Sequence, residues 1–417
     1  MQHLIIGAGP AGVVAAETLR KADPDAAIAI IGDEPEPPYS RMAIPYYLIN
    51  NIDESGTYLR DPKQHFDDLN IEVVQQRVDK IDTEGKSVTL ADGSIRSYDK
   101  LLLATGSRPV SPPIPGLDLP QVHSCWTLED ARNIVKLAQS GSNVVLIGAG
   151  FIGCIILEAL VKRGVNLAVV ETGNRMVPRM LNEKAGGLLE TWCKNQGIDV
   201  HTSCSVEGIS DAGESQIEVS LSDGSKLAAA LVITATGVKA NTDLVASSDI
   251  EVDQGILVNR RMQTSNPDVY AAGDVAQGVD FSTGNFEVQA IQPTATDHGR
   301  IAALNMAGQG DEHHGTLNMN VLDTVGLISC SFGLWMGVDG GDSAQLYNPE
   351  EFQYINLQFD GDHLVGASSV GKTQHVGVLR GLIESRIHLG EWKQRLMRDP
   401  TAIMEAYVAC TQELSYH

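Results

Sequence analysis

The chain has 417 residues, of which 43% are hydrophobic, 20% are charged and 41 are glycine. This is the composition of a folded protein with two or three domains, and its glycine share exceeds the usual ~7%, as recurring phosphate-binding turns would require. The net charge of −23 argues against nucleic acid as a partner, and because no run of 18 apolar residues occurs, we expect no membrane insertion.

The N-terminal residues have the pattern of a dinucleotide-binding turn. An apolar strand that begins at His3 precedes the turn GAGPAG, and a helix with alanines on its close-packed face follows it. Because the strand begins so early, we expect no signal peptide and a cytoplasmic location. Glycines in such a turn permit the tight bend and the approach of the backbone to a pyrophosphate. The next strand, AAIAIIGDE, ends in Asp33 and Glu34, either of which can bind ribose hydroxyl groups.

The glycine pattern returns 141 residues later, in NVVLIGAGFIGCIILEALVKRG. It again stands between an apolar strand and a helix, and the strand that follows ends in Glu171. A carboxylate at that place accepts hydrogen bonds from a 2′-hydroxyl and repels a 2′-phosphate, so we expect NADH to be favoured over NADPH. Arg175 lies four residues further on and could soften this preference, but we interpret it as a solvated side chain.

Three other strands end in short glycine-containing signatures. Two of them close with Thr-Gly, at Thr105–Gly106 and at Thr236–Gly237, and the third runs into Gly273–Asp274. The last hundred residues read as strands followed by a helical tail, because apolar residues recur there at helical spacing.

The six cysteines are Cys125, Cys154, Cys193, Cys204, Cys330 and Cys410. None of them form a CxxC pair, a redox pair or an iron–sulfur ligand run, so we expect no metal site and no cluster in this chain. Most should be small buried hydrophobic residues. Cys154 begins a packed helix and is expected to belong to the core, and Cys410, being single, is a weak candidate for chemistry.

Together these motifs resemble the two-dinucleotide FAD/NAD(P)H oxidoreductases of the pyridine nucleotide-disulfide superfamily, such as NADH:rubredoxin reductase, the flavin part of assimilatory nitrite reductase and coenzyme A disulfide reductase. The resemblance covers nearly the whole chain and implies FAD in the first unit and NAD(H) in the second, with the nicotinamide stacked on the flavin. It also implies that Asp274 contacts the ribityl chain and that the helix near Thr294 points at the flavin ring. The expected FAD residues are Gly7, Gly9, Pro10, Ala11, Gly12, Asp33, Glu34, Arg41, Thr105, Gly106, Gly273, Asp274 and Thr294. The expected NAD residues are Gly148, Gly150, Phe151, Ile152, Gly153, Glu171 and Gly237.

The same resemblance implies an α/β fold with two Rossmann-like dinucleotide-binding domains and a C-terminal α+β domain. We expect the FAD domain to comprise residues 1–113 and 243–310, because the Gly-Asp motif must return to the first sheet. The NAD domain, residues 114–242, would be inserted into it. Residues 311–417 would form the third domain, which covers the flavin or makes an interface.

The segment EPPYSRMAIPYYLIN departs from these relatives. Its arginine, Arg41, matches one that helps to hold FAD in rubredoxin- and ferredoxin-type reductases. Coenzyme A disulfide reductases have a cysteine three residues before a Pro-Tyr pair, where this chain has Met42, and a thioether cannot form a thiolate. The ferredoxin-reductase type has a lysine near the flavin where this chain has Tyr46. The glutamate that can face that lysine is replaced by Ile155, and joint loss of an ion pair is physically coherent.

We therefore expect an FAD-dependent NADH:acceptor oxidoreductase in which no protein residue acts as the catalyst and Tyr46 lies near the flavin. Hydride would pass between NAD(H) and FAD, and single electrons between FAD and an iron–sulfur or rubredoxin-like protein. The narrower expectation is a subunit of a 2-oxoacid oxidoreductase complex such as phenylglyoxylate dehydrogenase. The alternatives are a stand-alone NADH oxidase that forms hydrogen peroxide and a non-enzymatic flavoprotein that senses NADH.

Overall fold

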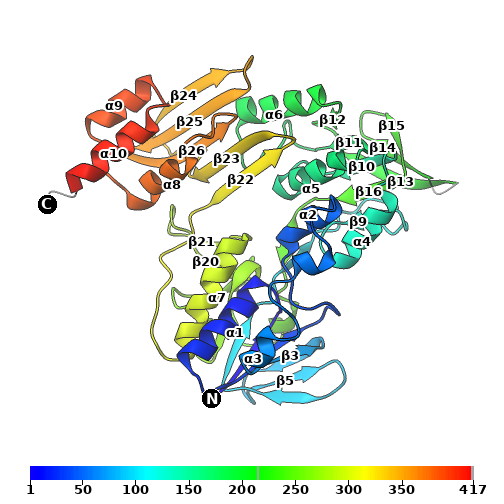
Figure 1. Cartoon of the computed structure of the whole chain (residues 1–417), viewed down its shortest axis with the longest axis vertical. Helices are drawn as coiled ribbons and strands as arrows, with labels where there is room; N and C mark the ends of the chain where they lie inside the picture. The colour runs from blue at the N-terminus through cyan, green and yellow to red at the C-terminus, as the bar shows by residue number, and fades with distance from the viewer. Residues whose placement is uncertain (214–215, 415–417) are drawn as a thin grey trace. The chain divides into compact units, whose positions relative to one another are not determined.

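The computed structural model describes residues 1–213 and 216–414 (Figure 1). These residues form two compact units, one from Met1–Pro109 with Val238–Thr316, and the other from Val110–Gly237 with the residues from Leu317 onward. Within the described residues, no helix is both long and apolar enough to cross a membrane. The assignment of FAD, NAD and third domains to particular residue ranges stays a prediction.

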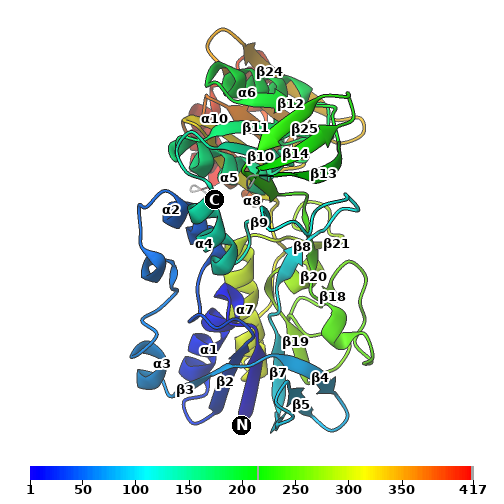
Figure 2. The same cartoon turned by 90° about the vertical axis from the view of Figure 1, so that its right-hand side faces the viewer.

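The first unit is built on a five-stranded parallel sheet with the order β19-β7-β1-β2-β3 (Figure 2). The strands are β1 (Gln2–Ile6), β2 (Ala27–Gly32), β3 (Ile71–Gln75), β7 (Lys100–Leu103) and β19 (Val269–Ala271). Helices α1 (Pro10–Ala22) and α7 (Gln292–Met306) pack against each other beside it (Figure 1). Strand β19 leads directly into the Gly-Asp motif, so that motif does return to the first sheet.

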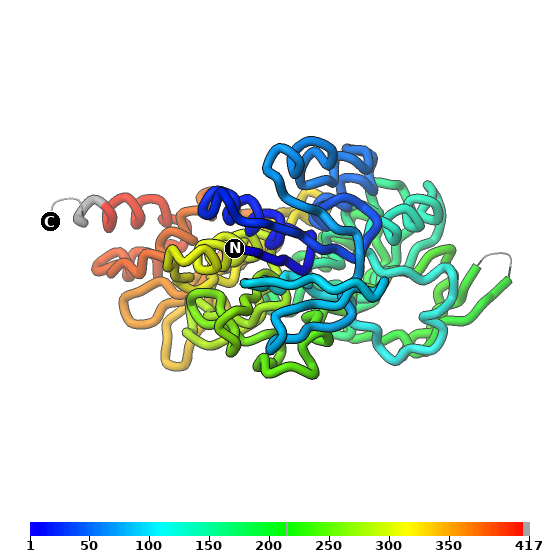
Figure 3. The backbone as a smooth tube through the Cα atoms, turned by 90° about the horizontal axis from the view of Figure 1, so that it is seen from below, coloured from blue at the N-terminus to red at the C-terminus, as the bar shows by residue number. Residues whose placement is uncertain are grey.

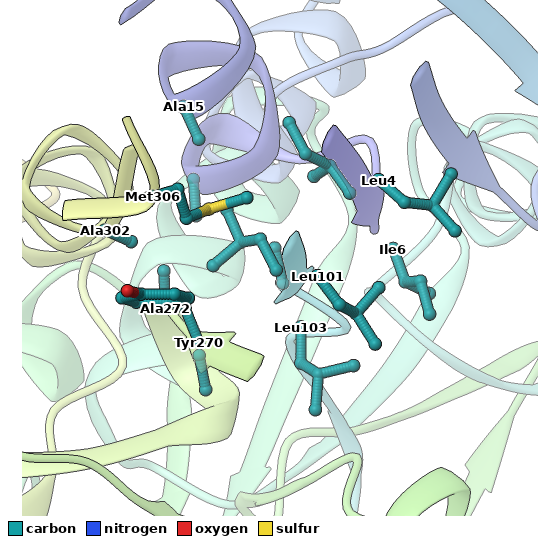
Figure 4. Close-up of a cluster of buried hydrophobic side chains, with 14 of the residues drawn as sticks. Leu4, Ile6, Ala15, Leu101, Leu103, Tyr270, Ala272, Ala302 and Met306 are labelled. Atoms are coloured by element: carbon teal, nitrogen blue, oxygen red, sulfur yellow. The ribbon is translucent and has the colours of Figure 1, made fainter. Parts of the chain in front are cut away.

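The core of this unit lies between the sheet and the helices. Figure 4 shows Leu4 and Ile6 of β1 beside Leu101 and Leu103 of β7, with Met306 of α7 nearby, and all five are buried. Parallel sheets are covered on both faces, and their strands therefore read as continuous apolar runs. This is why these strands could be recognised from sequence.

The second unit contains a parallel sheet of the same kind, with the order β12-β11-β10-β16-β9. Its strands are β9 (Val122–Ser124), β10 (Asn143–Ile147), β11 (Asn166–Val170), β12 (Asp199–His201) and β16 (Leu231–Thr234). Its helices are α4 (Leu128–Leu137), α5 (Phe151–Lys162) and α6 (Glu183–Asn195). Helix α4 begins with a capping box, in which Thr127 and Asp130 each accept a hydrogen bond from the other's backbone N–H. The two Rossmann-like sheets predicted from the glycine patterns are therefore confirmed.

Short strands and helices flank the parallel sheets in both units. The first unit carries β4 (Val78–Asp82), β5 (Ser87–Leu90), β6 (Ile95–Ser97), β8 (Ser107–Pro109), β17 (Val238–Ala240), β18 (Ile256–Leu257), β20 (Ala276–Val279) and β21 (Phe286–Val288). Its short helices are η1 (Arg41–Ala43), α2 (Ile44–Leu48), η2 (Glu54–Thr57), α3 (His65–Asp68), η3 (Asp243–Val245) and η4 (Gly273–Val275). The second unit has the meander β13 (Val206–Gly213), β14 (Gln216–Leu221) and β15 (Lys226–Ala229).

The C-terminal residues form an antiparallel sheet with the order β22-β23-β26-β25-β24. The strands are β22 (Met319–Thr324), β23 (Leu327–Gly333), β24 (Asp342–Asn348), β25 (Gln353–Asp360) and β26 (His363–Val370). Helices α8 (Val376–Ser385), α9 (Glu391–Arg398) and α10 (Ile403–Leu414) follow and lie together, as the red tube of Figure 3 shows. The predicted α+β character of this region is confirmed.

Part of this C-terminal sheet packs on the helices of the second unit. Strand β22 contacts α5, and β26 contacts α6. The indole N–H of Trp192 donates to the carbonyl oxygen of Thr324 at 3.1 Å, and the Asn182 amide donates to the Tyr354 hydroxyl. These contacts make the C-terminal sheet and the second parallel sheet one compact body.

Candidate dinucleotide sites

The first glycine turn has no room for side chains where the chain bends. Gly7 has φ +117°, and a Cβ there would lie 2.0 Å from the carbonyl oxygen of Ala104. A Cβ on Gly12 would lie 2.0 Å from the carbonyl oxygen of Gly7. Gly9, in contrast, faces open space and begins α1 without any side-chain cap. The open N–H groups of the first helical turn therefore fit an anionic pyrophosphate.

The Gly-Asp motif and α7 are held against the same turn by small residues. A Cβ on Gly299 of α7 would lie 2.3 Å from the carbonyl oxygen of Ala11, so the two helices touch backbone to backbone. A Cβ on Gly273 would lie 3.3 Å from the Cβ of Ala11 and 3.4 Å from that of Ala295. Thr294 is buried in the first turn of α7. The sequence separates these segments by more than 250 residues, and the fold brings them together.

Asp274 is held by a hydrogen bond from the Ser107 hydroxyl, at 2.7 Å. Burial raises the pKa of Asp274, while that hydrogen bond and the positive charge of Arg41 lower it in part. The carboxylate is therefore an acceptor with few competing partners, as a group that binds the hydroxyls of a ligand should be. Sequence reasoning did not identify Ser107 as its partner.

The two acids after β2 differ in environment. Glu34 accepts hydrogen bonds from Arg41, at 2.6 Å, and from the Tyr39 hydroxyl, and Arg41 also donates to the Tyr39 oxygen at 2.9 Å. Asp33 is exposed, and Arg41 is half-buried. Glu34 and Arg41 thus form an ion pair at the end of the second strand, a contact that the residue spacing alone did not reveal.

The loop that ends β7 is fixed by an asparagine from the returning segment. The Thr105 hydroxyl donates to the carbonyl oxygen of Asn241 at 3.0 Å, and the Asn241 amide donates back to the Thr105 carbonyl at 2.8 Å. Gly106 has φ +67° and faces open space. The Thr-Gly signature therefore forms the connection between strands β7 and β8, and the backbone at Gly106 faces open space.

The second glycine turn repeats the first. Gly148 has φ +102°, and a Cβ there would lie 2.4 Å from the Ala235 carbonyl oxygen. A Cβ on Gly153 would lie 2.1 Å from the Gly148 carbonyl oxygen, whereas Gly150 faces open space. Phe151 and Ile152 form the uncapped first turn of α5. Gly237, with φ +108°, also faces open space. This geometry fits a second dinucleotide.

The Glu171 carboxylate is buried and hydrogen-bonded to the backbone around the glycine turn. It is 8% exposed, and its two oxygens accept hydrogen bonds from the backbone N–H groups of Ala149 and Gly173, each at 2.7 Å. The Ala149 carbonyl oxygen in turn accepts from the N–H of Val177 at 2.8 Å. The peptide groups of Ala149 are thus held on both sides by the loop that follows β11. This clamp was not predicted, because it joins residues that are distant in sequence.

Arg175 is not free in solvent, contrary to our interpretation of the sequence. It is half-buried, and its guanidinium group donates to the carbonyl oxygens of Leu181, at 2.8 Å, and Pro178, at 3.2 Å. These bonds hold it along its own loop, because the loop turns back on itself and presents carbonyl groups to the arginine.

The replaced family positions lie in the segment after β2 and in helix α5. Met42 and Tyr46 are 49% and 56% exposed, on η1 and α2. Ile155 is half-buried on α5, which belongs to the other unit. The proposed nearness of Tyr46 to a flavin stays a prediction.

None of the six cysteines is arranged for thiol chemistry. Five of them are buried, including Cys154 and Cys410. Burial raises the pKa of Cys125, Cys193 and Cys330 to about 12 and that of Cys154 well above its ordinary value. Such thiols are not ionised at neutral pH and are poor nucleophiles. Among the described residues, no group of three or more His, Cys, Asp or Glu side chains could hold a metal ion.

Comparison with known proteins identifies the family. The chain is 30% identical over 405 residues to subunit epsilon of the NADH-dependent phenylglyoxylate dehydrogenase of Aromatoleum evansii, and the match covers 96% of each chain. It is 33% identical over 332 residues to an NADH oxidase of Methanocaldococcus jannaschii, covering 77% of this chain and 73% of that one. The NADH:rubredoxin oxidoreductase of Clostridium acetobutylicum superposes with a TM-score of 0.76 at 26% identity, over 93% and 96% of the chains. The family model for pyridine nucleotide-disulphide oxidoreductases matches residues 1–299. The chain belongs to this family of oxidoreductases, which use FAD and NAD(H).

Proposed function

We propose that this FAD- and NAD(H)-dependent oxidoreductase exchanges electrons with a separate iron–sulfur or rubredoxin-like protein. A bound flavin supplies hydride exchange with NAD(H) and single-electron exchange with a partner. The protein contributes binding, orientation and a dry environment. The single observation that carries the proposal is that Met42 stands where the reactive cysteine would be, while five of the six cysteines are buried.

In this proposal the first unit holds FAD. The glycine turn and the first turn of α1 would bind the pyrophosphate, and Glu34, paired with Arg41, would bind ribose together with Asp33. Asp274 would accept hydrogen bonds from the ribityl hydroxyls. The first turn of α7, with Thr294, would face the flavin ring, and the backbone at Gly106 would line the site. The open space at Gly9 and the buried carboxylate of Asp274 support this assignment.

The second unit would hold NAD(H) in the same way. The turn from Gly148 to Gly153 and the first turn of α5 would bind its pyrophosphate, and Gly237 would lie beside it. Glu171 would both accept hydrogen bonds from ribose and repel a 2′-phosphate. Each Glu171 oxygen accepts one backbone N–H. Oε1 also accepts from the Thr172 hydroxyl at 3.3 Å, so Oε2 keeps a lone pair for a ribose hydroxyl.

The finer proposal is membership of a larger complex that oxidises a 2-oxoacid and reduces NAD. Its support is the relative from Aromatoleum evansii, which is named as a subunit and matches this chain almost from end to end. A cytoplasmic location accords with five cysteines that form no disulfide, because oxidising compartments favour disulfides; these are Cys125, Cys154, Cys193, Cys204 and Cys330. A hydrogen-peroxide-forming NADH oxidase is the second candidate, favoured by the match to the Methanocaldococcus jannaschii protein.

One experiment separates these two candidates. The purified holoprotein is supplied with NADH, and reduction of ferricyanide or a viologen dye is compared with oxygen consumption. We expect rapid dye reduction, slow oxygen consumption, and co-purification from native extracts with polypeptides that contain iron and sulfide. A protein that purifies alone and consumes oxygen as fast as it reduces dyes would be an oxidase, and the partner proposal would fail.

A further inference from the structure

A row of polar side chains crosses the C-terminal sheet, one from each strand. The strand register places Asn320 of β22 opposite Ser331 of β23, Ser331 opposite Ser368 of β26, and Ser368 opposite Asn356 of β25. Gln345 of β24 lies opposite Asn356 and completes the row. Because paired residues of neighbouring strands point to the same face, all five side chains lie on one face of the sheet.

The three central members of this row are buried and lack partners. Ser331, Ser368 and Asn356 are each at most 1% exposed. Their side-chain oxygens have no hydrogen-bond partner among the described residues, although the Asn356 amide N–H donates weakly to the Trp335 carbonyl oxygen at 3.4 Å. Ser329, two residues before Ser331 on the same face, and Thr324 have buried, unpartnered hydroxyls as well.

This face is turned toward the helices of the second parallel sheet. Tyr354, two residues before Asn356 and thus on the same face, accepts a hydrogen bond from Asn182 at the start of α6. At the edge of the row, the ammonium group of Lys184 donates to the Gln345 oxygen at 2.6 Å. Strand β26, which carries Ser368, packs against α6. The row therefore lies in the layer between the sheet and α6.

A dry arrangement of this kind is energetically unfavourable. Each buried polar atom without a partner costs ~1–3 kcal/mol, and several of them together would consume much of the ~5–15 kcal/mol that stabilises a typical protein. An internal water forms about three hydrogen bonds and satisfies polar groups of this type. The row carries no formal charge at its centre, so neither an anion nor a cation is matched by the groups present.

We infer that this layer is a binding site for ordered internal water, with Ser331, Ser368 and Asn356 as its ligands. Water fits because hydroxyl groups both donate and accept, and the Asn356 oxygen accepts. The row is closed at its centre and ends at an exposed residue, Gln345, and at the half-buried Asn320. This inference does not depend on the proposed electron partner.

Substitution by alanine tests the inference, because bound water and dry hydroxyls predict opposite changes in the unfolding equilibrium constant. In the FAD-loaded protein, Ser331→Ala and Ser368→Ala are compared by denaturant unfolding with Ser369→Ala as the matched control. Ser369 is equally buried, but its hydroxyl donates to the Lys372 carbonyl oxygen, so its loss should favour unfolding about fivefold. If water binds the row, both test variants should also raise the unfolding equilibrium constant severalfold, and their effects should be non-additive in the double variant. If the hydroxyls are dry, their removal would lower that constant, and this result would overturn the inference.

A second measurement does not rely on any variant folding. Crystals of the unmodified protein that diffract well enough to show solvent should contain discrete water density within hydrogen-bond distance of Ser331, Ser368 and Asn356. An empty layer, or direct hydrogen bonds among these three side chains, would show that the site holds no water.

Discussion

At the residue scale, Glu171 combines two roles that sequence reasoning treated as one. Its role in ribose binding is predicted because an acid after the second strand of a glycine-turn fold can accept hydrogen bonds from ribose hydroxyls. Its hydrogen bonds to Ala149 and Gly173 were not predictable, because they depend on how the following loop folds back on the turn. A residue that we propose to bind the ribose is therefore also part of the structure that shapes the site.

Replacement of Glu171 should thus change both specificity and stability. Glu171→Arg should narrow or reverse the preference for NADH over NADPH, because attraction of the 2′-phosphate replaces repulsion. Glu171→Gln should weaken the preference and lower the free energy of unfolding by ~1–3 kcal/mol, because an amide cannot accept both backbone N–H groups. Steady-state kinetics with both nucleotides and denaturant unfolding measure the two effects.

Glu207→Gln is the matched control, since Glu207 is exposed on β13. It should shift stability by less than ~0.5 kcal/mol and leave nucleotide preference unchanged. The interpretation of Glu171 is wrong if the unmodified protein already uses NADPH as well as NADH.

A second residue-scale feature is the buried pair His298 and His313. Their rings meet edge to face, with centroids 4.7 Å apart, and both ring nitrogens of His298 lack partners among the described residues. Burial, with a smaller contribution from His313, lowers the pKa of His298 to about 3. The unfolded chain binds a proton there near pH 6.5 and the folded chain does not, so stability must fall as the pH drops from about 6.5 toward 3.

His298→Phe should flatten this acid sensitivity. Phenylalanine is also a planar ring and needs no hydrogen bonds, so stability at pH 7.5 should change little, and the loss below pH 6 should shrink by as much as ~1.4 kcal/mol per pH unit. Denaturant unfolding between pH 4.5 and 7.5 measures this slope. His388→Phe serves as the control, because His388 also lies against a histidine, His363, but its side chain is 80% exposed. Equal slopes in the original protein and the His298 variant would contradict the prediction.

At the element scale, the two parallel sheets share one strand–turn–helix arrangement but differ in the residue at the end of the second strand. The register pairs Ile6 with Ile31 in the first sheet and Ile147 with Val170 in the second, so Gly32 occupies the position that corresponds to Glu171. A Cβ on Gly32 would lie 2.9 Å from that of Ala8, so a side chain does not fit there, and the acids proposed for the first site, Asp33 and Glu34, follow it in the chain.

Helices and strands that have a local sequence pattern could be predicted from the sequence. Contacts that depend on packing between distant segments could not. Apolar runs followed by glycine turns identified β1, β10 and the helices after them, because these signals span fewer than 20 residues. Three features join segments that are distant in the sequence. They are the hydrogen bonds between Asn241 and Thr105, the hydrogen bond from Ser107 to Asp274, and the polar row of the C-terminal sheet. No spacing rule gives such contacts without the strand order and register.

The contact between α1 and α7 gives a prediction at this scale. Gly299→Ala should push α7 away from α1, because its Cβ would lie 2.3 Å from the backbone oxygen of Ala11. The variant should retain less FAD after purification and dialysis, since α7 and the first glycine turn are held together there. The matched control is Gly187→Ala in α6, where no atom lies within 4 Å of the added Cβ and stability should rise by ~0.5–1 kcal/mol. The ratio of flavin absorbance to protein measures retention, and full FAD content in the Gly299 variant would refute the argument.

At the scale of the whole molecule, the chemistry should be independent of every cysteine. All six thiols lie in the second unit, and five of them are buried. A variant with all six changed to Ala or Ser, provided that it folds and holds FAD, should reduce dyes with NADH within severalfold of the original rate. Disulfides and coenzyme A disulfide should be poor substrates for both proteins. A hundredfold loss, ~2.7 kcal/mol of barrier, would show that a thiol takes part.

The strand order of the first sheet also determines the order in which the sites can be completed during synthesis. Strand β7 lacks its outer neighbour until β19, residues 269–271, has left the ribosome, whereas every strand of the second parallel sheet lies between residues 122 and 234. At ~5–20 residues per second, the second sheet can close some seconds before the first. During that interval β7 has an unpaired edge, which is a template for aggregation. The sheet of the proposed FAD site is thus completed after the sheet of the proposed NAD(H) site.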